Sequence, residues 1–331
     1  MASPTPNHEA AGRATGQGRR LGHEVLRSQE LWLFVTLVAM CAVFSVRVPG
    51  FLELATFRNV ALQSAVEGII AVGMTLVIIS GGIDLSVGSV LGAAGVTATL
   101  MMARGVPVAV AVACTLALGA LVGCFNGFLV AWVRIPPFIV TLAMLSMARG
   151  YAMLLTNSRT VKDYPRSFNW LGSGTVAGLP APVWLMGAVF AGGYVVLRHT
   201  RFGRHVYAVG GNAEAARLAG VPVRRTIVGV YCLLSALAAL AGMINAGRLG
   251  AGDPTEGKEA ELHVIAAVVL GGTSLMGGEG SLLGTLIGAF VIGFLHKGLG
   301  LQGVDYFWQL VIIGTVILAA VALNQVRRRL R

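Results

Sequence analysis

The segment Gly252–Glu259, GDPTEGKE, has residue types and spacing that could hold a phosphate group. In a phosphate-binding loop, backbone N–H groups and a lysine hold the phosphates, and a Ser or Thr after the lysine binds Mg²⁺. Here Glu259 occupies the hydroxyl position, and no strand is predicted before the segment. We therefore reject a nucleotide site. The sequence also contains no catalytic Ser/His/Asp set and no metal-ligand cluster, so we expect no enzymatic activity and no cofactor.

A few ionisable residues lie in or beside long apolar runs. Glu67 and Arg149 fall within such runs, where a charge costs roughly 2.5–3.5 kcal/mol on insertion scales, so each needs a partner or water. They could pair with each other. Asp84, in GGIDLSVGS between two runs, could be part of a gate, but a helix cap is the favoured interpretation. His263 and His296 lie near the ends of runs and are interpreted as interfacial residues.

The basic stretch 201–225, RFGRHVYAVGGNAEAARLAGVPVRR, contains a short predicted helix. Asn212 is a good N-cap, because its side-chain oxygen can accept from an otherwise unpaired backbone N–H. Gly220 suits the left-handed position after the last turn, and Pro222 prevents the helix from resuming. Glu214 and Arg217 are three residues apart and share a face.

About two helical turns are not stable alone in water, so this helix needs a groove in which to lie. Beside the charged pair it has a small apolar surface, formed by Ala215, Ala216, Leu218 and Ala219. We interpret the segment 198–225 as a docking element on the cytoplasmic side of a membrane protein. The alternative is a basic connecting loop that only fixes the topology.

The composition is that of an all-α polytopic membrane protein. Of the 331 residues, 56% are hydrophobic and 12% charged, with a mean hydropathy of +0.77, whereas soluble proteins carry about 25% charged residues. The 45 glycines are typical of closely packed transmembrane helices. The net charge of +11 comes from basic residues that flank apolar runs, so it indicates membrane lipid and not nucleic acid. The four cysteines lie inside apolar runs and are expected to be free thiols.

The apolar runs predict ten spans in a domain over 31–323, between a flexible basic tail at 1–30 and a basic tail at 324–331. The first span begins at about residue 31. The others are expected at about 60–80, 85–103, 106–132, 137–155, 182–197, 226–247, 261–276, 281–300 and 307–323.

The positions of the 25 Lys and Arg residues predict the orientation. With the N-terminus inside, 15 lie in inside segments and nine outside, while Arg149 lies within a span. The nine outside are Arg47, Arg58, Arg104, Arg159, Lys162, Arg166, Arg248, Lys258 and Lys297. Cytoplasmic segments carry the excess of Lys and Arg, so both termini and the segment 198–225 are predicted to be cytoplasmic.

Glycines recur at intervals of four and predict close helix packing; a glycine-lined solute path is the less favoured interpretation. The series are Gly88 and Gly92; Gly119, Gly123 and Gly127; and Gly284 and Gly288. The segment Gly81–Ala93 also aligns with Gly277–Ala289, an internal similarity of the kind that repeats in transporters produce. In the predicted topology both copies run the same way, so they do not indicate an inverted repeat.

Several stretches together resemble the ribose-type sugar permeases of bacterial ABC importers. They are GMTLVIISGGIDLSVGS (Gly73–Ser89), TRFGRHVYAVGGNAEAARLAGVPV (Thr200–Val223), ELHVIAAVVLGGTSLMGGEGSLLGTLIGA (Glu261–Ala289) and the basic C-terminal end. The resemblance covers about 31–328. It implies the ABC importer permease fold, a bacterial plasma (inner) membrane location, a second permease subunit, an ATPase with two cassettes per chain and a periplasmic or extracellular sugar-binding protein.

Within this resemblance, Glu214, Ala215, Ala216 and Gly220 are similar to the Glu-Ala-Ala…Gly signature of importer permeases, which implies that this loop contacts the ATPase. The long basic N-terminal tail and Glu279 depart from the family pattern. The sugar stays open, because relatives carry ribose, other sugars or autoinducer-2. The alternatives are a permease for branched-chain amino acids and an ion-coupled secondary transporter, for which Glu67 is the one clear candidate site. An integral-membrane enzyme would need a catalytic cluster that the sequence lacks.

The basic-residue bias leads to a labelling prediction. In a variant without the four native cysteines, single cysteines at Asn212 and Ser158 should react from opposite sides of the membrane. An impermeant thiol reagent added to intact cells should therefore label only the cysteine at 158. Labelling of both positions from outside would contradict the predicted topology.

Overall fold

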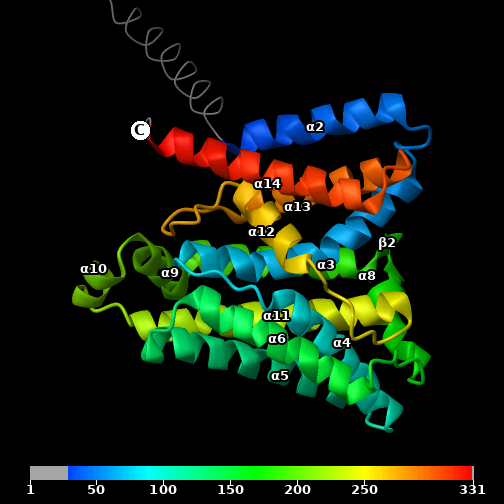
Figure 1. Cartoon of the computed structure of the whole chain (residues 1–331), viewed down its shortest axis with the longest axis horizontal. Helices are drawn as coiled ribbons and strands as arrows, with labels where there is room; N and C mark the ends of the chain where they lie inside the picture. Colours follow the sequence, from blue (N-terminus) through cyan, green and yellow to red (C-terminus); the bar gives the residue numbers. More distant parts are fainter. Residues whose placement is uncertain (1–28, 330–331) are drawn as a thin grey trace, which may run out of the picture.

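The structure is a computed structural model that describes residues 29–329. It is a bundle of helices with one two-stranded hairpin (Figure 1). The long and apolar helices are α2 (Gln29–Arg47), α3 (Leu54–Ile79), α4 (Val87–Ala103), α5 (Val108–Phe128), α6 (Pro137–Thr156), α8 (Ala181–His199), α11 (Val223–Leu249), α12 (Ala260–Leu270), α13 (Leu282–Leu301) and α14 (Tyr306–Arg329).

Smaller elements connect these helices. A π-helical turn, η1 (Leu129–Val133), extends α5. The other short elements are η2 (Arg166–Asn169), α7 (Trp170–Ser173), the antiparallel pair β1 (Thr175–Val176) and β2 (Leu179–Pro180), α9 (Arg201–Gly211) and α10 (Ala213–Leu218).

Each of the ten predicted spans coincides with a helix. Within residues 29–329, seven helices are long and apolar enough to cross a membrane, and α4, α12 and the described apolar part of α14 are shorter. One prediction is wrong in extent: the span expected at 261–276 ends as a helix at Leu270. Helix α14 extends beyond the span predicted at 307–323 and includes the described part of the basic tail, as far as Arg329. Residues 1–28 of the predicted N-terminal tail lie outside the described part of the chain.

Helix α11 lies at the centre and packs against α3, α4 and α5. Glycines allow this close approach. A Cβ at Gly123 would overlap the backbone carbonyl of Tyr231, and one at Gly119 would press on the carbonyl of Ser235. The third glycine of this series, Gly127, meets the α11 backbone at Val228. The packing interpretation of this glycine stripe is therefore confirmed.

Helices α4 and α12 begin inside the bundle. Gly88, at the start of α4, packs against the carbonyl of Gly257, just before α12, and Gly92 packs against the carbonyl of Glu256. The two helix N-termini thus meet in the interior. They are reached through the non-helical segments 80–86 and 250–259. Discontinuous helices of this kind form the binding regions of many transporters.

The two similar segments found in the sequence also meet. Each starts at a turn with a positive-φ glycine, Gly81 (φ +87°) and Gly277 (φ +83°), and each continues into a helix, α4 or α13. A Cβ on Gly277 would lie 3.1 Å from the Cα of Gly81. Both turns would be strained with any other residue, since L side chains rarely adopt this backbone conformation.

Figure 1 shows α9, α10 and the C-terminal end of α14 at one end of the bundle and the β1–β2 hairpin at the other. The segment 198–225 and the C-terminal end of α14 therefore lie at the same end of the bundle. Which side of the membrane this end faces stays a prediction.

The α5–α11 contact can be tested with Gly123→Leu. The added side chain would overlap backbone atoms, which no change of rotamer can relieve. We therefore expect the free energy of unfolding to fall by roughly 1–3 kcal/mol, the usual cost of overpacking. Thermal unfolding in detergent should shift to a lower temperature. Gly150→Leu is the matched control, because that helical glycine has nothing within 4 Å of its Cβ position. Equal unfolding temperatures for the two variants would contradict this packing.

Candidate functional site

Helix α10 is held by the caps that its sequence predicts. Asn212 Oδ1 accepts hydrogen bonds from the backbone N–H groups of Glu214 (3.0 Å) and Ala215 (2.9 Å). At the other end, Gly220 has φ +83°, and its N–H donates to the carbonyl of Arg217. These caps stabilise a helix of six residues that would not persist alone.

The exposed face of α10 differs from the expected one. Ala216 is buried against the rest of the chain, with 6% of its surface exposed, so it supports α10 from within. The outward apolar surface consists of Ala215, Leu218 and Ala219, and Leu218 is 74% exposed. Of the four residues expected to form the apolar surface, Ala216 is therefore the one that does not lie on it.

The predicted pair of Glu214 and Arg217 is an ion pair at the rim of this face. Arg217 donates from Nη2 to Glu214 Oε1 at 2.5 Å and from Nε to Oε2 at 3.0 Å. These hydrogen bonds and the guanidinium charge lower the pKa of Glu214. Both side chains are exposed, so the pair contributes little to stability and mainly fixes the shape of the rim.

Helix α9 was not predicted, although its sequence carries a signal. Val206 and Val209 are buried on one face, and Thr200 caps the helix by accepting from the N–H of Gly203 at 3.2 Å. Gly210 packs directly on the carbonyl of Ile79 at the end of α3. Tyr207 donates from its hydroxyl to the carbonyl of Gly280 at 2.9 Å. Through these contacts α9 joins α10 to both glycine turns.

In the interior, Arg149 holds the segment that precedes α12. Its Nη1 donates to the carbonyls of Pro254 (2.6 Å) and Glu256 (2.7 Å). The carboxylate of Glu256 accepts from Asn245 Nδ2 at 2.8 Å. The segment Gly252–Glu259 is therefore a partly buried structural segment, and two of its carbonyls accept hydrogen bonds from Arg149.

The same segment is tied to the α6–α7 connection. Val161 and Gly252 exchange backbone hydrogen bonds of 2.8 and 2.9 Å. Partial burial tends to raise the pKa of Asp253, but hydrogen bonds from Thr255 and Thr160 and the charge of Arg149 outweigh it and lower the pKa. Asp253 thus stays charged at the edge of the bundle.

Glu67 and Arg149 do not pair with each other. Glu67 Oε1 lies 3.3 Å from Nδ1 of His263, with 15% and 16% of the two side chains exposed. His263 therefore packs against Glu67, and its position at the membrane interface stays a prediction. The ring of His296, on α13, lies 6.2 Å from that of His263. Sequence spacing could not show this contact, because Glu67 and His263 are 196 residues apart.

Asp84 is fully buried beside the start of α4. Its Oδ1 accepts from the backbone N–H (2.7 Å) and the hydroxyl (2.6 Å) of Ser86. Ser86, and not Asp84, occupies the N-cap position. Asn126 donates to the Ser86 hydroxyl at 3.4 Å, which links this turn to α5. Asp84 therefore shapes the turn before the helix.

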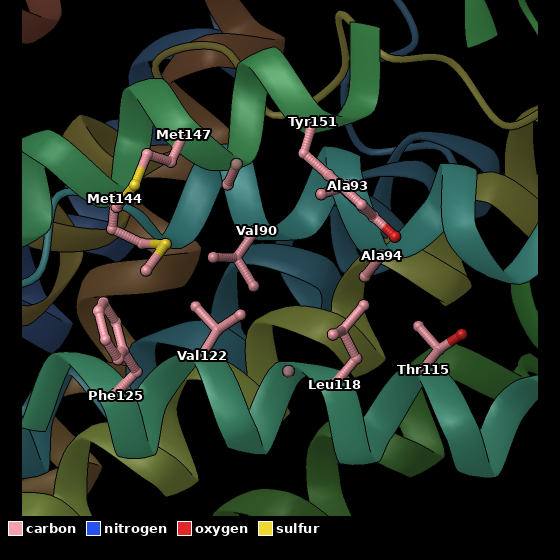
Figure 2. Close-up of a pocket in the computed structure, with 12 residues that line it drawn as sticks. Val90, Ala93, Ala94, Thr115, Leu118, Val122, Phe125, Met144, Met147 and Tyr151 are labelled. Carbon is pink, nitrogen blue, oxygen red and sulfur yellow. The ribbon is translucent and has the colours of Figure 1, made fainter. Parts of the chain in front are cut away.

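An apolar cavity of about 250 Å³ lies between α4, α5 and α6 (Figure 2). A monosaccharide needs a hydrogen-bond partner for most of its hydroxyl groups, since a buried polar group without one is costly. Thr115 and Tyr151 bring the only side-chain hydroxyls in the lining, so the cavity does not fit a sugar. Its residues are Val90, Ala93, Ala94, Thr115, Leu118, Gly119, Val122, Phe125, Met144, Met147, Ala148 and Tyr151.

Comparison with known proteins places this arrangement in a family. Residues 56–321 match the family described as "Branched-chain amino acid transport system / permease component". The chain belongs to this family. It is the permease component of an ABC importer, in which the ATPase is a separate subunit, and membership implies ATPase and binding-protein partners.

Curated relatives are similar over nearly the whole permease. The ribose import permease protein of Escherichia coli K12 is 45% identical over 294 residues, which cover 88% of this chain and 92% of that protein. The ribose import permease of Bacillus subtilis 168 is 42% identical, with 90% and 93% covered. The xylose transport system permease of E. coli K12 is 35% identical, with 93% and 95% covered. No solved structure matches the chain.

The role of Arg149 can be tested with Arg149→Gln. The change weakens two charge-assisted hydrogen bonds to partly buried carbonyls. We therefore expect the free energy of unfolding to fall by about 1.5–3 kcal/mol, which should appear as a lower unfolding temperature in detergent. Arg159→Gln is the control, because that arginine is exposed and makes no side-chain hydrogen bond within the described residues. If both variants unfold like the parent protein, Arg149 does not hold the segment.

Proposed function

We propose that this permease carries a monosaccharide across the bacterial plasma (inner) membrane. A periplasmic or extracellular binding protein would deliver the sugar, and a cytoplasmic double-cassette ATPase would drive the transport. The similarity to ribose and xylose permeases supports a sugar, with branched-chain amino acids as the second substrate class because of the family's description. A second permease subunit would complete the pathway, and both termini would be cytoplasmic.

The observation that carries this proposal is the α9–α10 unit. Helix α10 of this unit presents an exposed apolar surface with a charged rim, which suits insertion into a groove on a partner. The ATPase would receive this surface, formed by Ala215, Leu218 and Ala219 with the pair Glu214–Arg217. Gly220 would aim the chain as it leaves the helix.

The contacts of α9 suggest how a partner's movement would reach the interior. Gly210 packs on the carbonyl of Ile79, and the N–H of Gly278 donates to the same carbonyl at 2.8 Å. Beyond this junction lie the segments that lead to α4 and α13. A shift of α10 would thus act on the turn before α4 and on the turn after α12, the two discontinuous helices. We propose this as the route from ATP hydrolysis to opening of the path.

The test is Gly220→Val, with Gly105→Val as its control. Both glycines have positive φ, +83° and +86°, and nothing lies within 4 Å of either Cβ position. Both substitutions therefore carry a similar backbone cost of roughly 1–2 kcal/mol, but only residue 220 adjoins α10. Gly220→Val should reduce ATPase co-purification and uptake by about tenfold, the factor that 1.4 kcal/mol of lost contact energy gives. Gly105→Val should leave both unchanged.

Ala215→Trp tests the docking face itself. The large ring should hold α10 out of its groove, while the amount of membrane-embedded permease stays normal. Uptake of labelled ribose and xylose and sugar-stimulated ATP hydrolysis should both fall. Wild-type transport by Gly220→Val and Ala215→Trp, with the ATPase still bound, would reduce this segment to a topological connector.

A further inference from the structure

A second surface beside α10 has a different chemistry. A pocket of about 700 Å³ lies between the end of α5, the helix α10 and the start of α11. Figure 1 shows α10, the end of α5 and the start of α11 at the same end of the bundle. The lining consists of Ala131, Trp132, Arg134, Ala213, Glu214, Arg217, Pro222, Val223, Arg224 and Arg225.

The pocket carries an excess of positive charge. Its single acid, Glu214, is already paired with Arg217. Arg134 and Arg225 make no side-chain hydrogen bond or ion pair in the part of the chain that the structure describes. Arg224 lies over the ring of Trp132, with its guanidinium carbon 5.8 Å from the ring centroid. Three guanidinium groups are thus available to an anion.

The backbone at this point is built in an unusual way. Helix α5 ends in the π-helical turn η1, and Arg134 follows with φ +63°, a left-handed conformation that non-glycine residues seldom adopt. π-Helical turns are frequent at functional sites. Residues with a rarely adopted backbone conformation also cluster there, and the surrounding structure must hold them in that conformation. Here they put Trp132 and Arg134 in the lining of the same pocket.

An apolar strip continues from the pocket along α5. Phe128, Trp132 and Val133 are 48%, 41% and 53% exposed, and the rings of Phe128 and Trp132 stack with centroids 5.6 Å apart. Trp at the end of a membrane-spanning helix is typical of the headgroup level of a bilayer. A ligand that uses both surfaces therefore has an anionic head and a hydrocarbon tail.

We infer that this pocket binds an anionic phospholipid. The headgroup phosphate lies among Arg134, Arg224 and Arg225, and the first acyl carbons lie on Phe128 and Trp132. Basic pockets between helices at the cytoplasmic surface are suited to such headgroups. An acidic protein surface would satisfy the arginines but would leave the aromatic strip unused. The bound lipid would brace the side of α10 that faces α5, a role separate from the proposed contact with the ATPase.

The experiment uses the full-length permease in nanodiscs of phosphatidylcholine with 20% phosphatidylglycerol. Lipids that stay bound after detergent extraction are counted by native mass spectrometry. The wild type should retain phosphatidylglycerol in clear excess over its share of the bilayer. In the double variant Arg134→Gln/Arg225→Gln, the amount of retained phosphatidylglycerol should fall about fivefold for each arginine removed. This factor corresponds to the contribution of one basic residue near a membrane surface, about 1 kcal/mol.

Arg159→Gln/Arg166→Gln, which removes two exposed arginines between α6 and α7, should retain the lipid like the wild type. Soluble glycerol phosphate at millimolar concentration should not displace it, since the tail contributes to binding. The proposal fails if the wild type shows no preference for phosphatidylglycerol, or if glycerol phosphate displaces it completely. It also fails if the first double variant keeps the lipid but loses the ATPase, because the pocket would then receive an acidic protein surface.

Discussion

Backbone N–H and C=O groups that are shielded from water need partners within the protein, and this requirement governs the centre of the permease. The segments 80–86 and 250–259 are not helical, although they lie among membrane-spanning helices. Arg149 supplies donors for two carbonyls of the second segment, and Asp84 accepts from the first. Only because these groups are satisfied can α4 and α12 begin inside the bundle.

Glycine residues also stabilise the centre of the permease, because they allow helix backbones to pack closely. In a membrane, helices gain little from the hydrophobic effect when they associate, so close van der Waals contact must hold them together. Gly88 and Gly92 let the 250–259 segment lie directly on α4, while Gly284 and Gly288 let α13 approach the backbone of α12. The matching glycines of the two similar segments thus have the same structural task, whether or not the segments arose by duplication.

Local features of this structure could be predicted from the sequence, and non-local ones could not. The caps of α10 depend on residues a few positions apart, so Asn212 and Gly220 were sufficient to predict them. The partners of Glu67 and Arg149 come from segments about 100 to 200 residues away, which spacing does not show. The burial of Ala216 escaped prediction for a related reason. A helix of six residues has too few positions to show which face meets the bundle.

If α10 receives the ATPase as proposed, the joint between α9 and α10 determines which movements of α10 reach the interior. Asn212 alone separates the two helices; its N–H bonds to the carbonyl of Ala208 in α9, and its side chain caps α10. One residue thus belongs to the hydrogen-bond pattern of both helices, which leaves little room for α10 to move independently. A force on α10 should therefore turn α9 with it. Since Gly210 rests on the carbonyl of Ile79 without an intervening side chain, that rotation displaces backbone against backbone at the junction of the two glycine turns.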